Sequence, residues 1–206
     1  MNFPILSSLI LLPVIGSLFL LFSKDKNSNT GKYVALFTSF VNFLISIYLW
    51  YQFDPTTSSF QFVEDREWLK GFINYKIGVD GISILFVVLT SFITPLCIIS
   101  VNNSVKYRLR DFLIAILVME SLMIGVFCSL DLVIFYLFFE AGLIPMFLII
   151  GIWGGTRRVY SAFKFFLYTL LGSVLMLVAI ISIYSISGTT DIVQLYELGI
   201  DIKYQN

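Results

Sequence analysis

Six continuous apolar stretches dominate this chain of 206 residues. About 20 residues of helix cross the roughly 30 Å hydrocarbon core of a bilayer, so stretches of this size are expected to span a membrane. Helix is the expected structure because backbone exposed to lipid must form its own hydrogen bonds, whereas the strands of a β-barrel would alternate apolar and polar residues. The predicted fold is therefore an all-α integral membrane bundle of about six transmembrane helices. The predicted spans are Ile5–Phe22, Tyr33–Phe53, Ile77–Val101, Phe112–Leu130, Leu132–Trp153 and Ser161–Ser187.

Composition supports a membrane protein and excludes several kinds of chemistry. Apolar residues make up 58% of the chain and charged residues only 13%, roughly half the charged share of a soluble domain. There is no histidine, which excludes a histidine-ligated haem, a histidine-based zinc site and a Ser-His-Asp triad. The two cysteines, Cys97 and Cys128, lie far apart in apolar runs, so this chain alone is not expected to hold an iron–sulfur cluster. We expect no cofactor and no metal in this chain, and a net charge of zero argues against nucleic acid as a partner.

Positive charge predicts the orientation of the chain in the bilayer. The loops after the first, third and fifth spans carry more lysines and arginines than the opposite side, and such residues collect on the cytoplasmic or matrix face. The N-terminus, the loop 54–76 and the tail after Gly188 are therefore expected outside. Mixed charge beside Trp68 in that loop is compatible with an interfacial segment lying on the bundle, and equally with a plain solvated loop. The two sets of cations are Lys24, Lys26, Lys32, Lys106, Arg108, Arg110, Arg157 and Arg158 on one side, and Arg66, Lys70, Lys76 and Lys203 on the other.

Four ionisable residues, Asp80, Glu120, Glu140 and Lys164, fall within the predicted spans, where a charge is costly and normally faces a partner or water. Glu120 and Glu140 each lie ten residues from Leu130, at the turn between the fourth and fifth spans. Both are therefore expected about 15 Å from that turn, near the bilayer midplane. Two acids at equal depth on adjacent antiparallel helices favour a proton path in which each acid exchanges a proton near neutral pH. The alternative is a protonated glutamate that makes a structural hydrogen bond between helices.

Lys164 and Asp80 each allow two interpretations. Ser161, Lys164, Tyr168 and Gly172 recur at helical spacing and form a polar or small stripe that is expected to face the bundle. The alternative is a lysine that extends to the lipid headgroups. Asp80 stands at the outer start of the third span, where an acid caps a helix N-terminus and interacts favourably with the helix dipole. A structural role is therefore favoured for Asp80. Together these residues indicate a proton or cation path.

Five segments of the chain resemble one family, and the resemblance is densest between Ile77 and Ile181. They are similar to the antiporter-like membrane subunits of proton-pumping NADH:quinone oxidoreductase (respiratory complex I), in particular those of the M type. The resemblance covers essentially the whole chain, and the combination of motifs is specific where a single motif is not. The segments are Gly78–Ser83, Met119–Leu122, Ser129–Met146, Ile150–Gly155 and Arg158–Ser173.

This resemblance implies a proton-translocating, non-redox subunit of the membrane arm, in a bacterial or mitochondrial inner membrane. NADH, FMN, iron–sulfur clusters and quinone are then expected in partner subunits, and neighbouring antiporter-like subunits are the expected partners. Glu140 matches the fifth-helix glutamate that pairs in the family with a lysine on the seventh helix. Glu120 matches the fourth-helix acid, and Lys164 matches a sixth-helix lysine. Residues 129–206 would begin the proton-translocating core, after four helices in residues 1–128.

The chain departs from that family in length. The family has about fourteen helices, whereas this sequence stops at Asn206 after six predicted spans. We therefore expect an N-terminal fragment that lacks the seventh-helix lysine. A subunit of a multisubunit sodium/proton antiporter, which shares the buried acid, is the alternative function. A third possibility is a structural or assembly element without transport.

Overall fold

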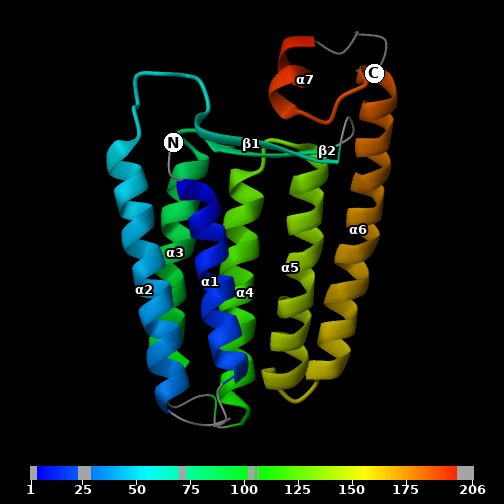
Figure 1. The fold of residues 1–206 in the computed structure, drawn as a ribbon. Coiled ribbons are helices and arrows are strands. Elements are labelled where there is room, and N and C mark those ends of the chain that lie inside the picture. The colour runs from blue at the N-terminus through cyan, green and yellow to red at the C-terminus, as the bar shows by residue number, and fades with distance from the viewer. Residues whose placement is uncertain (1–3, 23–28, 70–72, 102–104, 106, 199–206) are drawn as a thin grey trace.

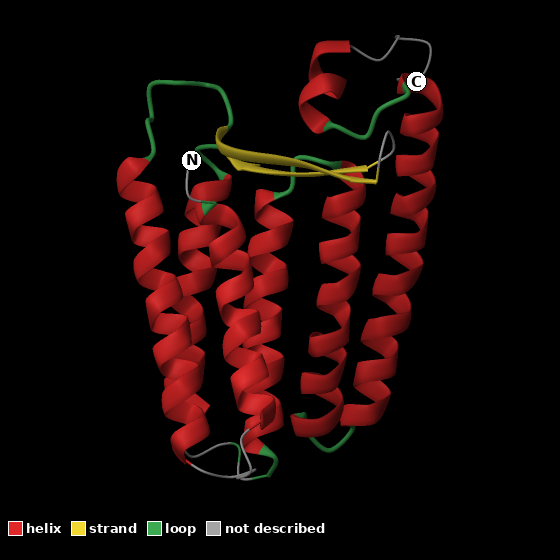
Figure 2. Cartoon of the chain, in the orientation of Figure 1, coloured by secondary structure: helices red, strands yellow, loops and turns green. Residues whose placement is uncertain are grey.

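The computed structural model describes residues 4–22, 29–69, 73–101, 105 and 107–198. Within these residues six long helices stand side by side, and a β-hairpin and a short helix lie at one end of the bundle (Figures 1 and 2). Each long helix has the length and hydropathy of a membrane span, which confirms the predicted helical membrane bundle. The elements are α1 (Ile5–Phe22), α2 (Asn29–Gln52), β1 (Gln61–Leu69), β2 (Ile73–Val79), α3 (Ser83–Ser100), α4 (Leu109–Cys128), α5 (Leu132–Trp153), α6 (Arg158–Ser187) and α7 (Ile192–Leu198).

The predicted spans agree with these helices to within a few residues, with one exception. The first and fifth predictions coincide with α1 and α5. The prediction that the third span begins at Ile77 is wrong, because residues 77–79 belong to β2 and α3 begins only at Ser83. A short apolar run fits a strand as well as a helix, and here pairing with another strand decides between them.

The outer loop 54–76 contains β1 and most of β2, an antiparallel hairpin that the sequence analysis did not predict. The two strands pair in a register that places Asp65 opposite Lys76. The hairpin lies across one end of the bundle and contacts α1, α4 and α5 (Figure 1). Glu64 on β1 accepts a hydrogen bond from the backbone N–H of Leu6 at 2.9 Å, which ties the hairpin to the start of α1. This packing favours the interfacial segment over the plain solvated loop.

The start of α1, the hairpin and α7 gather at one end of the bundle, as expected for segments on a single side of the membrane (Figure 1). Lys76 on β2 forms an ion pair of 2.5 Å with Asp191, at the start of α7, and so fastens the segment after α6 to the hairpin. Which end faces the outside stays a prediction. The cations Lys24, Lys26, Lys70, Lys106 and Lys203, and the side chain of Trp68, lie outside the described residues.

The central helix of the bundle is α4, which packs against α1, α2, α3 and α5 and is the most buried span. Only 11% of the most apolar stretch of α6 is buried, because α6 packs mainly on α5. Two apolar clusters form the core, one toward the hairpin and one toward the opposite end. The hairpin-end cluster is Leu6, Leu9, Ile10, Leu49, Ile77, Val79, Ile84, Val87, Ile124 and Cys128, and the opposite cluster is Leu20, Ala35, Ile98, Leu113, Ile116 and Leu117.

Candidate functional site

A layer of buried polar side chains lies at the middle of the bundle, between the two apolar clusters. Along each of α1 to α4, the buried polar residues fall between the residue numbers of the two clusters. Apolar residues above and below therefore separate this layer from both ends of the bundle. The layer, called the polar layer below, consists of Ser17, Ser39, Asn42, Ser46, Ser91, Thr94, Glu120 and Ser121.

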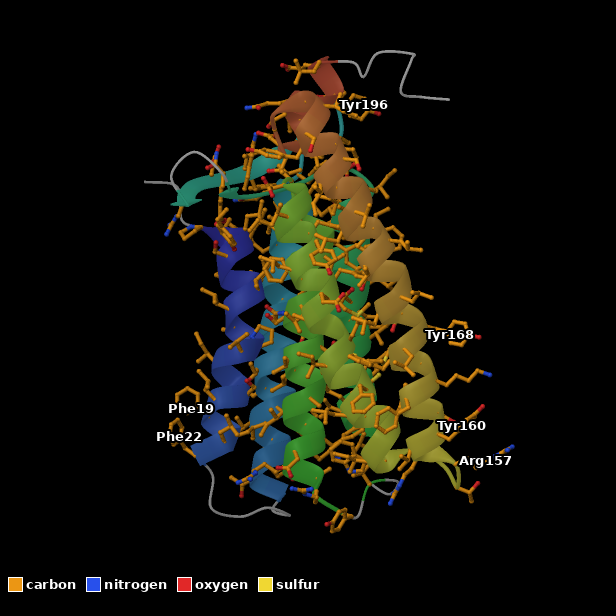
Figure 3. The ribbon with its side chains drawn as sticks, turned by 90° about the vertical axis from the view of Figure 1, so that its right-hand side faces the viewer. Phe19, Phe22, Arg157, Tyr160, Tyr168 and Tyr196 are labelled. Atoms are coloured by element: carbon orange, nitrogen blue, oxygen red, sulfur yellow. The ribbon has the colours of Figure 1, made fainter. Side chains whose placement is uncertain are left out.

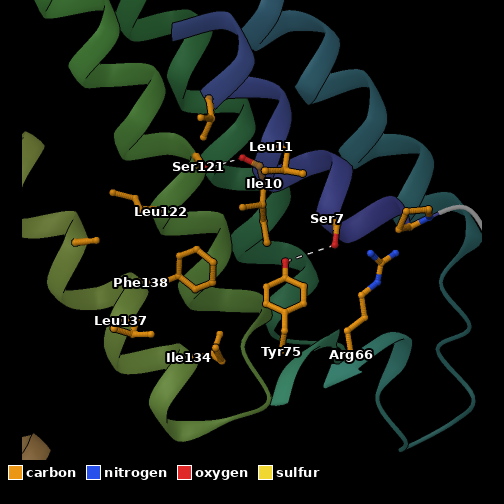
Figure 4. A pocket seen from close by; sticks show the side chains of 13 residues that line it. Ser7, Ile10, Leu11, Arg66, Tyr75, Ser121, Leu122, Ile134, Leu137 and Phe138 are labelled. Carbon is orange, nitrogen blue, oxygen red and sulfur yellow. Dashed lines mark hydrogen bonds between the residues drawn. The ribbon is translucent and has the colours of Figure 1, made fainter. Parts of the chain in front are cut away.

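The hydroxyl groups of the polar layer all find hydrogen-bond partners. The Ser46 and Ser91 hydroxyls are 2.7 Å apart and join α2 to α3. The Ser121 hydroxyl donates to the backbone oxygen of Ile10 and joins α4 to α1 (Figure 4). The remaining hydroxyls donate to carbonyl oxygens of their own helices. A buried hydroxyl without a partner would be costly, so these bonds make the layer compatible with the membrane interior.

Glu120 is the acid of this layer, and only 1% of its surface is exposed. The side-chain amide of the fully buried Asn42, on α2, donates from Nδ2 to Oε1 of Glu120 at 2.9 Å. Sequence analysis missed Asn42. The one signal for it was an amide in the middle of a predicted span, and that signal does not say which helix the amide faces.

Three buried side-chain atoms have no hydrogen-bond partner among the described residues: Asn42 Oδ1, Glu120 Oε2 and Glu140 Oε2. Buried polar atoms are satisfied in the great majority of cases, so each exception calls for an explanation. Both glutamates that the sequence singled out are in this set. The unsatisfied atoms therefore mark the region around α2, α4 and α5 as the candidate site.

Glu140 lies on α5 and is half-buried. The Phe138 ring covers Gly125, so closely that a side-chain carbon there would lie 2.5 Å from the ring, and this contact sets the register of α4 and α5. In that antiparallel register Glu120 is level with a position about three residues from Glu140, a difference of roughly 5 Å in depth. The expected equal depth thus holds to about one helical turn. No hydrogen bond between the two carboxyl groups occurs in the part of the chain that the structure describes.

Lys164 lies on the outer surface of α6. The side chains of Tyr160 and Tyr168 on the same helix point away from the bundle (Figure 3), and Tyr168 is 71% exposed. The prediction that this stripe faces the bundle is therefore wrong for the described helices. The helix buries a different face, with Ala162 and Ser173, which lies roughly a third of a turn away from the stripe.

The contact between α5 and α6 also separates Lys164 from Glu140. Phe147 packs against both Phe163 and Phe166, with ring centroids 5.5 and 5.4 Å apart. Lys164 is therefore level with Phe147, seven positions along α5 from Glu140, or roughly 10 Å along the helix axis. Together with Arg157, Tyr168 and others it lines a surface hollow of about 500 Å³.

Asp80 caps the start of α3, as its structural interpretation predicted. Its Oδ1 accepts from the backbone N–H of Ser83 at 2.7 Å, and the Ser83 hydroxyl accepts from the backbone N–H of Asp80 at 2.8 Å. This reciprocal arrangement has the hydrogen-bond pattern of a capping box and closes the turn that leads into α3. Burial acts to raise the pKa of Asp80, but the hydrogen bonds from Ser83 and neighbouring backbone outweigh it, so the pKa is lowered. Asp80 is thus a structural residue of the helix start.

A larger hollow, of about 880 Å³, opens between α1, α4 and α5 beneath the hairpin (Figure 4). Its walls are almost entirely apolar, and Arg66 and Tyr75 of the hairpin stand at its outer end. Neither glutamate lines it. Ser121 of the polar layer lies in its wall, so the hollow borders the polar layer but contains neither acid.

The fold and this site define a class: a polytopic helical membrane protein that holds ionisable side chains near the middle of its spans. Residues 129–205 match the family model described as NADH:quinone oxidoreductase/Mrp antiporter, TM. Over these residues the chain is similar to the membrane subunits that this model describes.

Individual relatives show the same similarity. The chain is 62% identical over 171 residues to NADH-quinone oxidoreductase subunit M of Rhodobacter capsulatus. This alignment covers 83% of the chain and 32% of the relative. It is 49% identical over 189 residues to NADH-ubiquinone oxidoreductase chain 4 of Marchantia polymorpha, covering 91% of the chain and 38% of the relative. These names do not favour the alternative of a sodium/proton antiporter subunit.

Structural comparison gives the same result. A chain in the structure of respiratory complex I from Thermus thermophilus with bound NADH superposes with a TM-score of 0.80 at 29% identity. That match covers 95% of this chain and 40% of the other. The chain thus spans about a third to two-fifths of the length of these relatives.

Proposed function

We propose that this chain belongs to a proton-translocating subunit of the membrane arm of an NADH:quinone oxidoreductase. Electron transfer from NADH to quinone would take place in other subunits, and this one would couple it to proton movement through buried carboxyl groups and a lysine. The observation that supports this most is the set of three unsatisfied buried atoms, two of which belong to Glu120 and Glu140. An intramembrane acid without a fixed partner is typical of an ion or proton pathway.

Glu140 and Glu120 would hold and exchange the protons. Glu140 is half-buried on one of the two least buried spans, and its buried Oε2 has no partner among the described residues. Lys164 belongs to the proposal for a related reason. Its ammonium group lies on the exposed face of α6, within a span, where a charge requires a partner or water.

Redox chemistry is assigned to the partners. The chain has no histidine and only two cysteines, which are too few for a four-ligand iron–sulfur cluster. NADH, FMN, iron–sulfur clusters and quinone would therefore bind in other subunits. The nearest partners would be neighbouring antiporter-like subunits in the same bacterial or mitochondrial inner membrane.

The test is proton pumping by the full-length protein in its assembled complex, measured in sealed vesicles together with NADH:quinone electron transfer. Glu140→Gln removes the exchangeable proton at nearly constant shape and is expected to lower NADH-driven pumping sharply. Glu197→Gln, on the exposed surface of α7, is the matched control and should pump normally. Normal pumping by an assembled Glu140→Ala enzyme would remove Glu140 from the path.

A further inference from the structure

Two of the three unsatisfied buried atoms belong to a single hydrogen-bonded pair. Asn42 donates from Nδ2 to Oε1 of Glu120, while Asn42 Oδ1 and Glu120 Oε2 are left without partners. Both residues are buried in the polar layer. The two unsatisfied atoms are therefore held on side chains that already bind each other.

The surroundings offer neither atom a donor. Ser39 and Ser121 donate to backbone oxygens, and Ser46 bonds to Ser91 and to the Phe43 carbonyl. An ionised carboxylate accepts hydrogen bonds and donates none, so it leaves the amide oxygen of Asn42 unsatisfied as well. With Glu120 ionised, both atoms stay without a partner.

Among the described residues, no cation on α4 or on a helix packed against it lies at the depth of Glu120. Lys76, on the strand β2 that also contacts α4, is paired with Asp191. Among the helices that pack on α4, α1 and α3 carry no charged side chain, and α5 carries only Glu140. The charged residue of α2 is Lys32, which lies in the first turn of that helix, ten positions from Asn42. On α4 itself the other charged groups, Arg110 and Asp111, lie in its first turn. An unpaired carboxylate would therefore stand in an apolar interior, which is unfavourable.

A proton on Glu120 supplies the donor that this pair lacks. The carboxyl O–H would donate to the amide oxygen, while the amide N–H continues to donate to the carboxyl oxygen. A carboxylic acid and a primary amide are complementary in this way, since each contributes one donor and one acceptor. One added proton thus satisfies both atoms.

We propose that Glu120 and Asn42 form a neutral acid–amide pair, in which Glu120 carries a proton on Oε2 and donates it to Oδ1 of Asn42. Asn42 is then a positioning residue that holds the protonated acid between α2 and α4. The protonation state follows from the local hydrogen bonds, and only its part in transport rests on the proposed function. The pair would act as a proton-holding site inside the polar layer.

Infrared difference spectroscopy of the full-length protein in its complex tests the pair directly, because a protonated carboxyl group has a carbonyl band that shifts in heavy water. Wild type is expected to show such a band, and Glu120→Gln should remove it. Asn42→Leu should shift the band to higher frequency, since both hydrogen bonds are lost. Ser39→Ala, which alters a neighbouring buried residue on the same helix, should leave the band in place. A spectrum that Glu120→Gln leaves unchanged, or a band that Asn42→Leu does not shift, would overturn the proposal.

Thermal unfolding gives a second readout that is independent of transport. The amide of Glu120→Gln can still donate to Oδ1 of Asn42, so this variant is expected to unfold at the wild-type temperature. Asn42→Leu is expected to unfold at a lower temperature, because it leaves the acid without a partner. Equal losses in the two variants would overturn the pairing. Normal pumping by Glu140→Gln with the Glu120 band present would instead reject the proposed function and leave the pair intact.

Discussion

Ser46 and Ser91 illustrate what a single buried polar contact contributes in this bundle. Both side chains are fully buried, and their hydroxyls bond across the α2–α3 interface at 2.7 Å. The Ser46 hydroxyl also lies 2.7 Å from the Phe43 carbonyl oxygen. If Ser91 is lost, Ser46 can therefore still donate within its own helix, and no buried hydroxyl is left without a partner.

We expect Ser91→Ala to lower the free energy of unfolding by only about 0.5–1 kcal/mol, the usual value of a hydrogen bond between membrane helices. The measurement is thermal or denaturant unfolding of the purified protein in detergent. Ser100→Ala, on the exposed end of the same helix, should have no measurable effect. A loss of several kcal/mol on Ser91→Ala would show that Ser46 does not find its second partner.

The Asp80 cap predicts a stability difference that depends on pH. Asp80→Ala removes the side-chain acceptor for the Ser83 N–H, which costs about 0.5–2 kcal/mol for a helix cap. Because the pKa of Asp80 is lowered in the folded protein, its contribution is present above the ordinary pKa of an aspartate and is lost as the pH falls through the folded-state pKa.

The stability gap between wild type and Asp80→Ala should accordingly be full at neutral pH and narrow in acid. Unfolding of both proteins in detergent across this pH range measures the gap. Asp80→Asn keeps a capping oxygen and is expected to stay close to wild type at neutral pH. A gap that widens on acidification would contradict the assigned direction of the pKa shift.

At the scale of elements, close backbone approach fixes how the helices pack. Gly16 on α1 faces Thr38 on α2, and a side-chain carbon at Gly16 would lie 2.6 Å from the Thr38 methyl group. Threonine has little freedom to move away because its β-branched side chain is stiff and its hydroxyl is bonded to the Val34 carbonyl. Small residues at such crossings are what allow membrane helices to approach closely.

Gly16→Ala is therefore expected to destabilise the protein by about 1–3 kcal/mol through overpacking at the α1–α2 crossing. Gly172→Ala on α6 is the matched control, since nothing lies within 4 Å of the added carbon. The control should leave stability unchanged or raise it slightly, because alanine favours helix. Equal effects of the two substitutions on the unfolding temperature in detergent would show that the crossing tolerates a wider spacing.

At the scale of the whole molecule, burial is unevenly distributed. Half of the most apolar stretch of α4 is buried, against 17% of that of α5 and 11% of that of α6. Other helices cover α4 on most sides, whereas α5 and α6, which carry Glu140 and Lys164, are largely uncovered. The polar layer with Glu120 lies in the covered part, so the two acids occupy different environments.

The predicted orientation can be checked by single-cysteine labelling in intact cells or organelles. A cysteine at Thr57, in the exposed segment between α2 and the hairpin, is expected to react with an impermeant maleimide from outside. A cysteine at Thr156, in the α5–α6 loop beside Arg157, should react only after permeabilisation, because positive loops stay on the cytoplasmic or matrix side. Cys97→Ser provides a background without the exposed native thiol. The reverse labelling pattern would invert the topology.

Much of this fold follows from properties that are local in the sequence. Runs of apolar residues predicted α1 and α5 to the residue, and a structural role for Asp80 was predicted because an acid at the outer start of a span caps a helix N-terminus. The hairpin was missed because β1 carries four successive charged residues and the end of β2 runs into the predicted third span. Only the pairing of the strands with each other and their packing on the bundle distinguish them from a loop. The outward face of Lys164 was missed because helical spacing groups residues on one side without saying which side is covered.

Residue type and spacing along the chain are enough to predict the six spans, the intramembrane acids and the family resemblance. The partners of the acids, in contrast, depend on how the helices pack. Asn42 and Glu120 are 78 positions apart, and their hydrogen bond exists because α2 and α4 pack with both residues at the same depth. The polar layer likewise appears only when the four helices are aligned. A buried charge or amide depends on what packs against it, and packing between distant segments leaves no periodic trace in one sequence.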